Sequence, residues 1–255
     1  MARRFEDKVV VVTGGSRGIG YAIASALVDE GATVIVASKN SARGTAAAEV
    51  LNAQDGGGRA AFVATDVTDK AQVEAMVAQV LAQHGRIDAL VNNAGVHDKA
   101  AFCDESEDLW QVMYRQNVMG VVLPSQAVVR DMQRRGEGGA IVHVSSKAGV
   151  VGEPGHAAYS AAKGAVIALT RAMAVELAWD QIRVNVVCPG PVLTDMLTGN
   201  VTAQADRDAL GADAPLGRIG LPEDIAGAVL YLASADSGWC TGQAINVDGG
   251  LSILK

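Results

Sequence analysis

The stretch TGGSRGIG, from Thr13 to Gly20, follows a run of four valines and precedes a helical pattern. Its glycines permit a tight turn and a close approach of the backbone to a ligand. A continuous apolar run is typical of a strand that is covered on both faces of a parallel sheet. The stretch therefore predicts a strand–turn–helix unit at the start of the chain.

The same alternation of strand and helix continues along the sequence. Short apolar runs predict strands at Val9–Thr13, Thr33–Ala37, Ala61–Ala64, Ala89–Asn92, Ala140–Ser145, Arg183–Val187 and Ala244–Val247. Helical patterns lie near Gly18–Glu30, Ala42–Ala53, Lys70–His84, Glu107–Arg135, Ala157–Trp179 and Glu223–Ala233. Right-handed crossovers then predict an α/β fold with a doubly wound parallel sheet. We expect one domain over residues 1–255.

The segment 194–220 breaks this alternation. It is polar and follows a strand, and a long insertion at the carboxyl end of a strand is often a lid over a binding site. A disordered surface loop is the alternative interpretation.

Composition and charge argue against several classes of protein. The chain carries 21 Lys and Arg against 28 Asp and Glu, a net charge of −7, and has no basic tract. This balance argues against binding to nucleic acid or to an anionic membrane. Cys103, Cys188 and Cys240 lie far apart, so neither a zinc site nor a disulfide framework is indicated. The N-terminal stretch is too short for a signal peptide or a membrane span, and a reduced cytoplasmic location is the simplest interpretation.

The glycine-rich turn is a candidate phosphate site. The N-terminus of the following helix offers free N–H groups and a positive dipole to a pyrophosphate. The candidate contacts are Gly14, Ser16, Arg17, Gly18 and Gly20. The spacing Gly-x-x-x-Gly-x-Gly differs from the common dinucleotide fingerprint. A plain tight turn is the alternative.

The end of the second strand predicts the choice of cofactor. A carboxylate there would bond the adenosine ribose and repel a 2′-phosphate. This chain has Ser38 and Lys39 instead, and Arg17 could face the same place. Two cations without an acid favour NADP(H) over NAD(H). A solvated surface lysine is the alternative for Lys39.

Two further strand ends supply candidate cofactor contacts. Asp66 and Val67 end the third strand, where the carboxylate could accept a hydrogen bond from the adenine amino group. Asn93, Ala94 and Gly95 end the fourth strand. Small residues there admit a ligand, although these residue types are also ordinary turn formers.

Tyr159 and Lys163, in the stretch YSAAK, form a candidate catalytic pair. Residues four apart share one face of a helix, and a nearby cation lowers the pKa of a phenol. Such a tyrosine can act as a general acid for carbonyl reduction and as a general base for alcohol oxidation. Ser146, after the fifth strand, could hold the substrate oxygen, and Asn117 could hold a water that links Lys163 to solvent. Structural roles, as a helix cap and a satisfied polar residue, are the alternatives for these two.

These features occur in one order across essentially the whole chain. The motifs are TGGSRGIG at Thr13–Gly20, Asp66, NNAG at Asn92–Gly95, Asn117, VSS ending at Ser146, YSAAK at Tyr159–Lys163, PGPVLTDM at Pro189–Met196 and INVDGG at Ile245–Gly250. As a set they resemble the short-chain dehydrogenase/reductase family, in its compact single-domain branch. The glycine spacing is that family's own pattern.

The resemblance implies a seven-stranded Rossmann sheet and a catalytic tetrad of Asn117, Ser146, Tyr159 and Lys163. It also implies that Lys163 bonds the nicotinamide ribose, that Thr194 contacts the carboxamide and that no zinc is bound. The further cofactor contacts that it implies are Ile19, Asn93, Tyr159, Pro189, Gly190 and Val192. Similar proteins are usually homotetramers.

The substrate remains open at this point. The candidate substrate contacts are His97, Ala148, Glu153, Met196 and Leu197. An NADP(H)-dependent carbonyl reductase or alcohol dehydrogenase is the leading hypothesis. The alternatives are a 3-oxoacyl thioester reductase, a silent cofactor-sensing protein and a sugar-nucleotide epimerase. An acid at Asp180, near an expected docking place, would repel an acidic acyl carrier.

Overall fold

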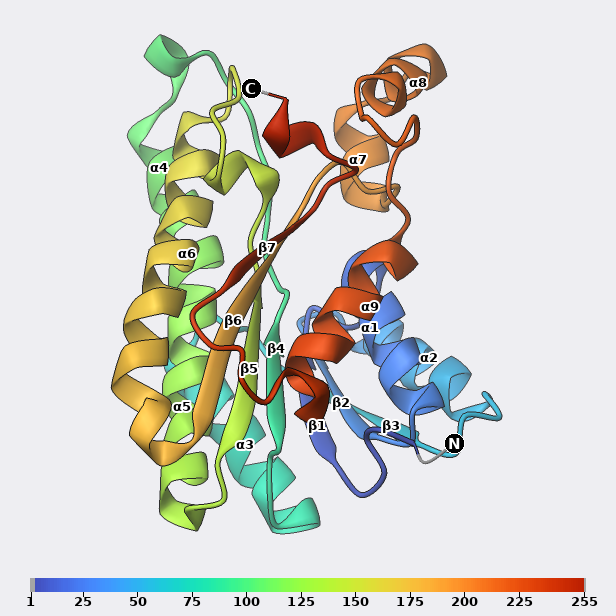
Figure 1. The fold of residues 1–255 in the computed structure, drawn as a ribbon, viewed down its shortest axis with the longest axis vertical. Coiled ribbons are helices and arrows are strands. Elements are labelled where there is room, and N and C mark those ends of the chain that lie inside the picture. The colour runs from blue at the N-terminus through green and yellow to red at the C-terminus, as the bar shows by residue number, and fades with distance from the viewer. Residues whose placement is uncertain (1–2, 255) are drawn as a thin grey trace.

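A seven-stranded parallel sheet forms the centre of the molecule, in a computed structural model that describes residues 3–254. The strand order is β3-β2-β1-β4-β5-β6-β7 (Figure 1). The strands are β1 (Val9–Thr13), β2 (Thr33–Ser38), β3 (Arg59–Ala64), β4 (Ala89–Asn92), β5 (Gly139–Val144), β6 (Ile182–Pro189) and β7 (Ala244–Val247). All seven predicted strands are confirmed, three with the predicted bounds and four with bounds that differ by one or two residues.

Helices cover both faces of the sheet, as predicted (Figure 1). They are α1 (Gly18–Asp29), α2 (Ser41–Asn52), α3 (Lys70–His84), α4 (Glu107–Tyr114), α5 (Gly120–Arg135), α6 (Ala157–Leu177), α7 (Asp195–Asn200), α8 (Gln204–Ala212) and α9 (Pro222–Ala233). Alternate residues of each strand face opposite layers, because side chains in a strand point to the two faces in turn. Val10 and Val12 pack in the cluster with α1 and α9, whereas Val9 and Val11 pack with α3 and α5.

The order of the strands reverses between β1 and β4. The chain runs outward from β1 to β2 and β3, then returns to β4 on the other side of β1. Thr13 and Asn92, the last residues of β1 and β4, are paired in register. In such sheets the crevice outside the carboxyl ends at this reversal is the usual ligand site.

Two segments differ from simple helices and loops. The predicted helix Glu107–Arg135 is interrupted by a π-helical turn at Arg115–Met119, which separates α4 from α5. The apolar period of the sequence continues through this turn and therefore does not reveal it. The segment 194–220 forms the short helices α7 and α8, which lie beyond the carboxyl ends of the strands (Figure 1).

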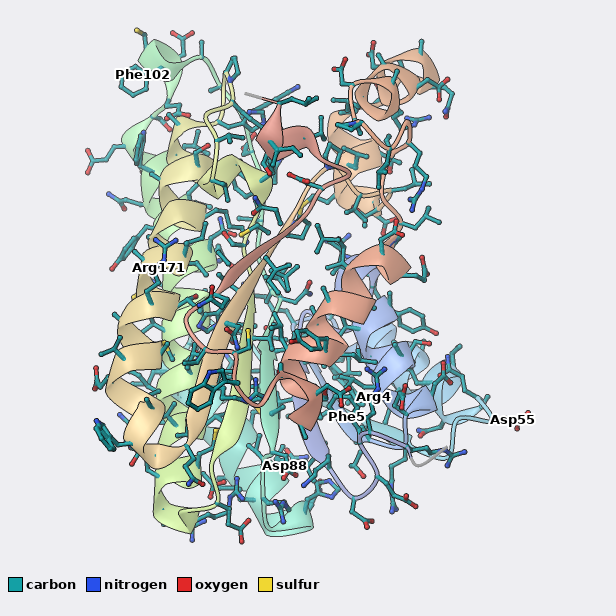
Figure 2. The ribbon with its side chains drawn as sticks, viewed as in Figure 1. Arg4, Phe5, Asp55, Asp88, Phe102 and Arg171 are labelled. Carbon is teal, nitrogen blue, oxygen red and sulfur yellow. The ribbon has the colours of Figure 1, made fainter. Side chains whose placement is uncertain are left out.

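A polar cluster around Asp88 lies at the amino ends of the strands, away from the crevice. Asp88 accepts a hydrogen bond from the Val9 N–H at 2.9 Å and pairs with Arg86 and Lys8. Figure 2 shows Asp88 at the end of the molecule away from α7 and α8. This cluster joins the beginnings of β1 and β4 and has no part in the crevice. None of the helices in residues 3–254 combines the length and the hydropathy that a membrane span needs.

Candidate active site

A cavity of about 640 Å³ opens at the carboxyl ends of the strands. Its walls come from the loops after β1, β2, β4, β5 and β6, from the start of α6 and from α7 and α8. This is the crevice that the reversal of strand order predicts. For reference, the part lined by the loops after β1 and β2 is called the nucleotide end, the part around Tyr159 the reacting centre, and the part lined by α7 and α8 the substrate end.

The glycine turn after β1 is held open for a ligand. Gly14 has a φ of +64°, which glycine adopts without strain, and a Cβ there would lie 2.9 Å from Asn93 Nδ2. Asn93 Nδ2 donates to the carbonyls of Thr13 and Gly14, at 3.1 and 3.3 Å. Arg17 caps α1 without a side-chain hydrogen bond. The first N–H groups of α1 are therefore available to an anion.

At the nucleotide end, the structure pairs two residues that the sequence analysis assigned to different parts of the cofactor. Lys39 Nζ lies 3.0 Å from Asp66 Oδ2, and the other Asp66 oxygen accepts hydrogen bonds from the Thr68 N–H and hydroxyl. Burial alone would raise the pKa of Asp66, but the bonds from Thr68 and Lys39 hold it below its usual value. The sequence analysis does not predict this ion pair, which forms because the ends of β2 and β3 lie side by side. The assignment of Lys39 to a 2′-phosphate stays a prediction.

Other cations remain at this end. Arg17 lies 3.6 Å from Asp195 of α7, and both side chains are largely exposed. Arg43, in the first turn of α2, lines the cavity and has no ion pair within the described residues. Sequence analysis missed Arg43, although its position one turn beyond the end of β2 could have indicated it.

These features fit a dinucleotide. Ser38 Oγ, at the end of β2, is buried on the cavity wall without a hydrogen-bond partner. An unpaired buried hydroxyl is costly and marks a place where a ligand group would bind. Together with the uncapped start of α1 and the glycine turn, it gives a set of residues that would suit a ribose and a pyrophosphate.

At the reacting centre, Tyr159, Lys163 and Ser146 line one part of the cavity. Lys163 Nζ lies 5.8 Å from the centre of the Tyr159 ring and donates to the carbonyl of Val144 at 3.1 Å. The Lys163 carbonyl accepts from Ser145 Oγ at 2.8 Å, which fixes α6 against the end of β5. Ser146 Oγ accepts from the Ala148 N–H at 3.2 Å and also interacts with the Tyr159 phenol.

Burial dominates the acid–base behaviour of this centre. Burial raises the pKa of the Tyr159 phenol to about 12, although its interaction with Ser146 acts in the opposite direction. Burial also lowers the pKa of the Lys163 ammonium to about 8. The expected lowering of the Tyr159 pKa by Lys163 is therefore not found in the protein alone. At neutral pH the phenol is protonated and Lys163 carries most of its charge.

Asn117 lies one layer behind the cavity. It is fully buried in the π-helical turn, and its Oδ1 accepts from the Val96 N–H at 3.1 Å. A Cβ added at Gly95 would lie 2.6 Å from Asn117 Oδ1 and 3.4 Å from Lys163 Nζ. Asn117 thus approaches Lys163 across Gly95, where it supports the loop after β4.

The substrate end is lined by both polar and apolar residues. His97, Lys147, Glu153 and His156 lie near Tyr159, and Lys147 forms an ion pair with Glu153. The apolar lining residues are Met196, Leu197, Val201 and Leu210.

Most of the residues predicted from the sequence line this one cavity. They are Gly14, Ser16, Arg17, Gly18, Ile19, Ser38, Lys39, Val67, Asn93, Ala94, Gly95, His97, Ser146, Glu153, Tyr159, Lys163, Pro189, Gly190, Val192, Thr194, Met196 and Leu197.

Four predicted residues do not line it, namely Gly20, Asp66, Asn117 and Ala148. Ala148 is buried in the turn after Ser146, so its predicted contact with the substrate is not supported. The residues that sequence analysis missed include Arg43, Gln116, Lys147, Val201 and Leu210. Within residues 3–254 no cluster of His, Cys, Asp or Glu could hold a metal ion.

Comparison with known proteins places this geometry in a family. Residues 14–252 match a family model described as enoyl-(acyl carrier protein) reductase, a model of short-chain dehydrogenases and reductases. A solved short-chain type dehydrogenase/reductase from Mycobacterium marinum superposes with a TM-score of 0.91 at 39% identity, covering 98% of this chain and 97% of that chain. The chain belongs to the short-chain dehydrogenase/reductase family. It is accordingly an oxidoreductase that acts on CH–OH and C=O groups.

Curated members of the short-chain dehydrogenase/reductase family align over nearly their whole length. An uncharacterized oxidoreductase of Methylorubrum extorquens is 43% identical, covering 97% of this chain and 99% of its own. A cyclopentanol dehydrogenase of Comamonas is 41% identical, covering 97% and 98%. A 3-oxoacyl-[acyl-carrier-protein] reductase of Chlamydia trachomatis is 39% identical, covering 96% and 98%. The names of these relatives span several substrates at similar identity, so identity alone does not choose among them.

Proposed function

We propose that this protein is an NADP(H)-dependent oxidoreductase that interconverts a ketone or aldehyde and an alcohol, with Tyr159 as general acid and base. The observation that carries the proposal is the convergence of Tyr159, Lys163 and Ser146 beside a crevice that fits a dinucleotide. The resemblance to a cyclopentanol dehydrogenase supports the reaction class.

Ser146, Tyr159 and Lys163 each have a separate role in carbonyl reduction. A nicotinamide held in this crevice would supply the hydride for the carbonyl carbon. The Ser146 hydroxyl donates a hydrogen bond to the carbonyl oxygen and holds it beside Tyr159. Tyr159, protonated because burial raises its pKa to about 12, gives its proton to the same oxygen. The charge of Lys163 stabilises the phenolate that this transfer leaves.

The preference for NADP(H) is proposed on the cations at the nucleotide end. Arg43 and Arg17 line the cavity beside Ser38, and no carboxylate stands at the end of β2. A 2′-phosphate could also take over Lys39 from Asp66, since a doubly charged phosphate attracts a cation more strongly. We expect NADPH to bind more tightly than NADH, and Arg43→Ala with Lys39→Asp to reverse the order. Equal affinities in the unmodified protein would contradict the preference.

The test of the reaction is NADPH oxidation over a broad panel of ketones, aldehydes, sugars and acyl thioesters. Tyr159→Phe keeps the ring and removes the proton, and we expect it to lower kcat by about 10²–10⁴-fold. Binding of NADPH, followed by its fluorescence, should be retained and serves as the folding control. Tight cofactor binding without any turnover would favour the sensor hypothesis.

A 3-oxoacyl thioester reductase is the second candidate, favoured by the Chlamydia relative. Docking of an acidic carrier needs free cations near the site. Arg134 and Arg135 both pair with the buried Asp131, at 2.6 and 3.1 Å, and Asp180 accepts a hydrogen bond from Gln133. This surface is therefore largely neutralised, and it lies at the end of the sheet away from the crevice, where Arg135 Nη2 donates to the Ile87 carbonyl at 2.7 Å just before β4 begins. Carrier-bound substrates that outperform all free ketones would establish this candidate instead.

Self-association, a mobile lid and a cytoplasmic location complete the proposal. Val175 and Trp179 of the α6 segment are 79% and 95% exposed, which suits an interface between copies in a homotetramer. Size-exclusion chromatography with light scattering tests this.

The segment 194–220 contributes Thr194, Met196, Leu197 and Leu210 to the cavity, as a lid would. Three free cysteines suit a reducing compartment.

A further inference from the structure

One side of the substrate end is a polar wall, formed by His97, Lys147, Glu153 and His156. His97 follows β4, and the other three lie on the loop between β5 and α6. An apolar wall, formed by Met196, Leu197, Val201 and Leu210, comes from the segment after β6. A substrate that contacts both walls therefore carries a polar group and an apolar group.

The polar wall is close to electrically neutral, and the adjacent Asp98 and Lys99, of which Lys99 also lines the cavity, act on the pKa of His97 in opposite directions. Lys147 and Glu153 form an ion pair whose side chains are only 11% and 26% exposed. Burial, and next the neighbouring His156, lower the pKa of His97, so its ring is uncharged at neutral pH. An anionic substrate would meet Glu153 and find the charge of Lys147 already compensated. Neutral groups that form hydrogen bonds suit this wall better.

His97 is the member of the polar wall that touches the reacting centre. Its ring meets the Tyr159 ring edge-on, with centroids 4.7 Å apart, and lies 5.0 Å from the His156 ring. Neither nitrogen of His97 makes a hydrogen bond to any residue in the described part of the chain. A neutral imidazole offers one donor and one acceptor, and both are open to a substrate group.

His156 is oriented differently. Its Nδ1 lies 2.9 Å from the Pro154 carbonyl oxygen. A carbonyl oxygen only accepts, so Nδ1 is assigned the proton and Nε2 is left as an acceptor in the neutral ring. This bond holds the ring against His97 and confines the space beside it. The group that His97 recognises must therefore be small and lie close to the carbonyl.

We propose that the substrate is a neutral hydroxy ketone, that its hydroxyl lies on a carbon next to the carbonyl, and that His97 selects it by a hydrogen bond. This rests on the proposed function, which supplies the reduction itself; the product is a vicinal diol. A ketone without the hydroxyl leaves both nitrogens of His97 unpaired once the cavity closes on it, which is unfavourable. His97 is a specificity residue, and Glu153 and Lys147 keep its surroundings neutral.

Four small ketones test the proposal with NADPH: hydroxyacetone, methoxyacetone, acetone and pyruvate. Methoxyacetone has an electron-withdrawing oxygen like that of hydroxyacetone but no O–H, so it separates recognition from carbonyl reactivity. We expect kcat/KM for hydroxyacetone to exceed that for methoxyacetone about tenfold, the size of one hydrogen bond. Pyruvate should be the poorest substrate relative to its reactivity, because of Glu153.

The variants isolate His97. His97→Phe keeps an aromatic ring against Tyr159 and should reduce the ratio of hydroxyacetone to methoxyacetone to near one. His97→Gln keeps a donor and an acceptor and should retain part of the ratio. His84→Phe, at the end of α3 and outside the cavity, is the matched control and should leave the ratio unchanged.

The outcomes separate this inference from the proposed function. Equal use of hydroxyacetone and methoxyacetone, a preference for pyruvate, or a ratio that His97→Phe does not alter would each overturn the inference. Tyr159-dependent reduction of other carbonyl compounds would then leave the proposed function in place. Failure to reduce any of the four ketones also overturns the inference, and the broad carbonyl panel decides whether the proposed function fails with it.

Discussion

Replacement of Lys163 by methionine tests how burial acts on the reacting centre. Burial lowers the pKa of this ammonium from 10.5 to about 8. Between these two values the unfolded chain holds a proton that the folded protein has released, so stability rises with pH across this window. Below pH 8 the folded protein bears the full cost of the buried charge, which is about 3 kcal/mol at 1.36 kcal/mol per pKa unit. Lys163→Met removes this dependence.

The assay is urea unfolding of the wild type and of Lys163→Met at a series of pH values. From pH 7.5 to 9.5 the wild type should gain about 2 kcal/mol relative to the variant. Taking the difference cancels the groups that do not interact with Lys163, and the buried groups near it titrate outside this window in the folded protein. Burial raises the pKa of Cys188 to about 11 and that of Tyr159 to about 12, and His143, lowered by burial to about 3, titrates far below the window. If the free energies of unfolding of the two proteins change with pH by the same amount, the argument is refuted.

Activity gives the same variant a second readout. Without the charge of Lys163 the phenolate of Tyr159 loses its stabilising cation, so we expect carbonyl reduction to be lost in Lys163→Met. Lys163→Met could be inactive and still unfold cooperatively, with a difference in free energy of unfolding from the wild type that does not change with pH. This result would show that Lys163 acts in catalysis while its pKa lies near the usual value.

Three further substitutions test other parts of the structure. Gly20→Ala puts a Cβ 2.4 Å from the Gly14 carbonyl oxygen and so disturbs the glycine turn. Fluorescence titration should then show an NADPH affinity that is reduced by at least about tenfold. An unchanged affinity would contradict the close packing of the turn. Gly227→Ala, on the exposed face of α9 with no atom within 4 Å of the new Cβ, should stabilise by about 1 kcal/mol in urea and leave turnover unchanged; a loss of stability would show a hidden contact. Asn117→Ala leaves the Val96 N–H without its acceptor and should cost about 1–3 kcal/mol in unfolding, together with a fall in kcat; if kcat falls at unchanged stability, Asn117 acts on the reaction and the Val96 bond contributes little.

The sheet and the reacting residues could be predicted from the sequence because their signals are local. Runs such as Val9–Thr13 are apolar at every position, and their alternation with helical patterns leaves little choice of topology. Tyr159 and Lys163 are four residues apart on one helix, so their proximity follows from helical geometry alone.

The missed features depend on contacts between distant segments. The sequence analysis assigns Lys39 and Asp66 to different cofactor groups. Ser38 and Ala64 are in register, however, which brings Lys39, the next residue, within reach of Asp66, two residues beyond Ala64. The ion pair of Lys147 and Glu153 depends on how the loop after β5 folds back, which no sequence period encodes. Arg43 was overlooked because a lone arginine at a helix start resembles an ordinary surface residue.

The π-helical turn at Arg115–Met119 has a consequence for changes in chain length. A π turn holds one residue more than an α-helical turn, and each residue in an α-helix advances the rotation by about 100°. Deleting a single residue there would convert α4 and α5 into one regular helix and rotate Asn117 away from Val96 and Gly95. By the same geometry, the loop between α7 and α8 can gain or lose a residue without turning any side chain of the reacting centre. The active site is thus far more sensitive to a one-residue deletion in the π-helical turn than to one in the loop between α7 and α8.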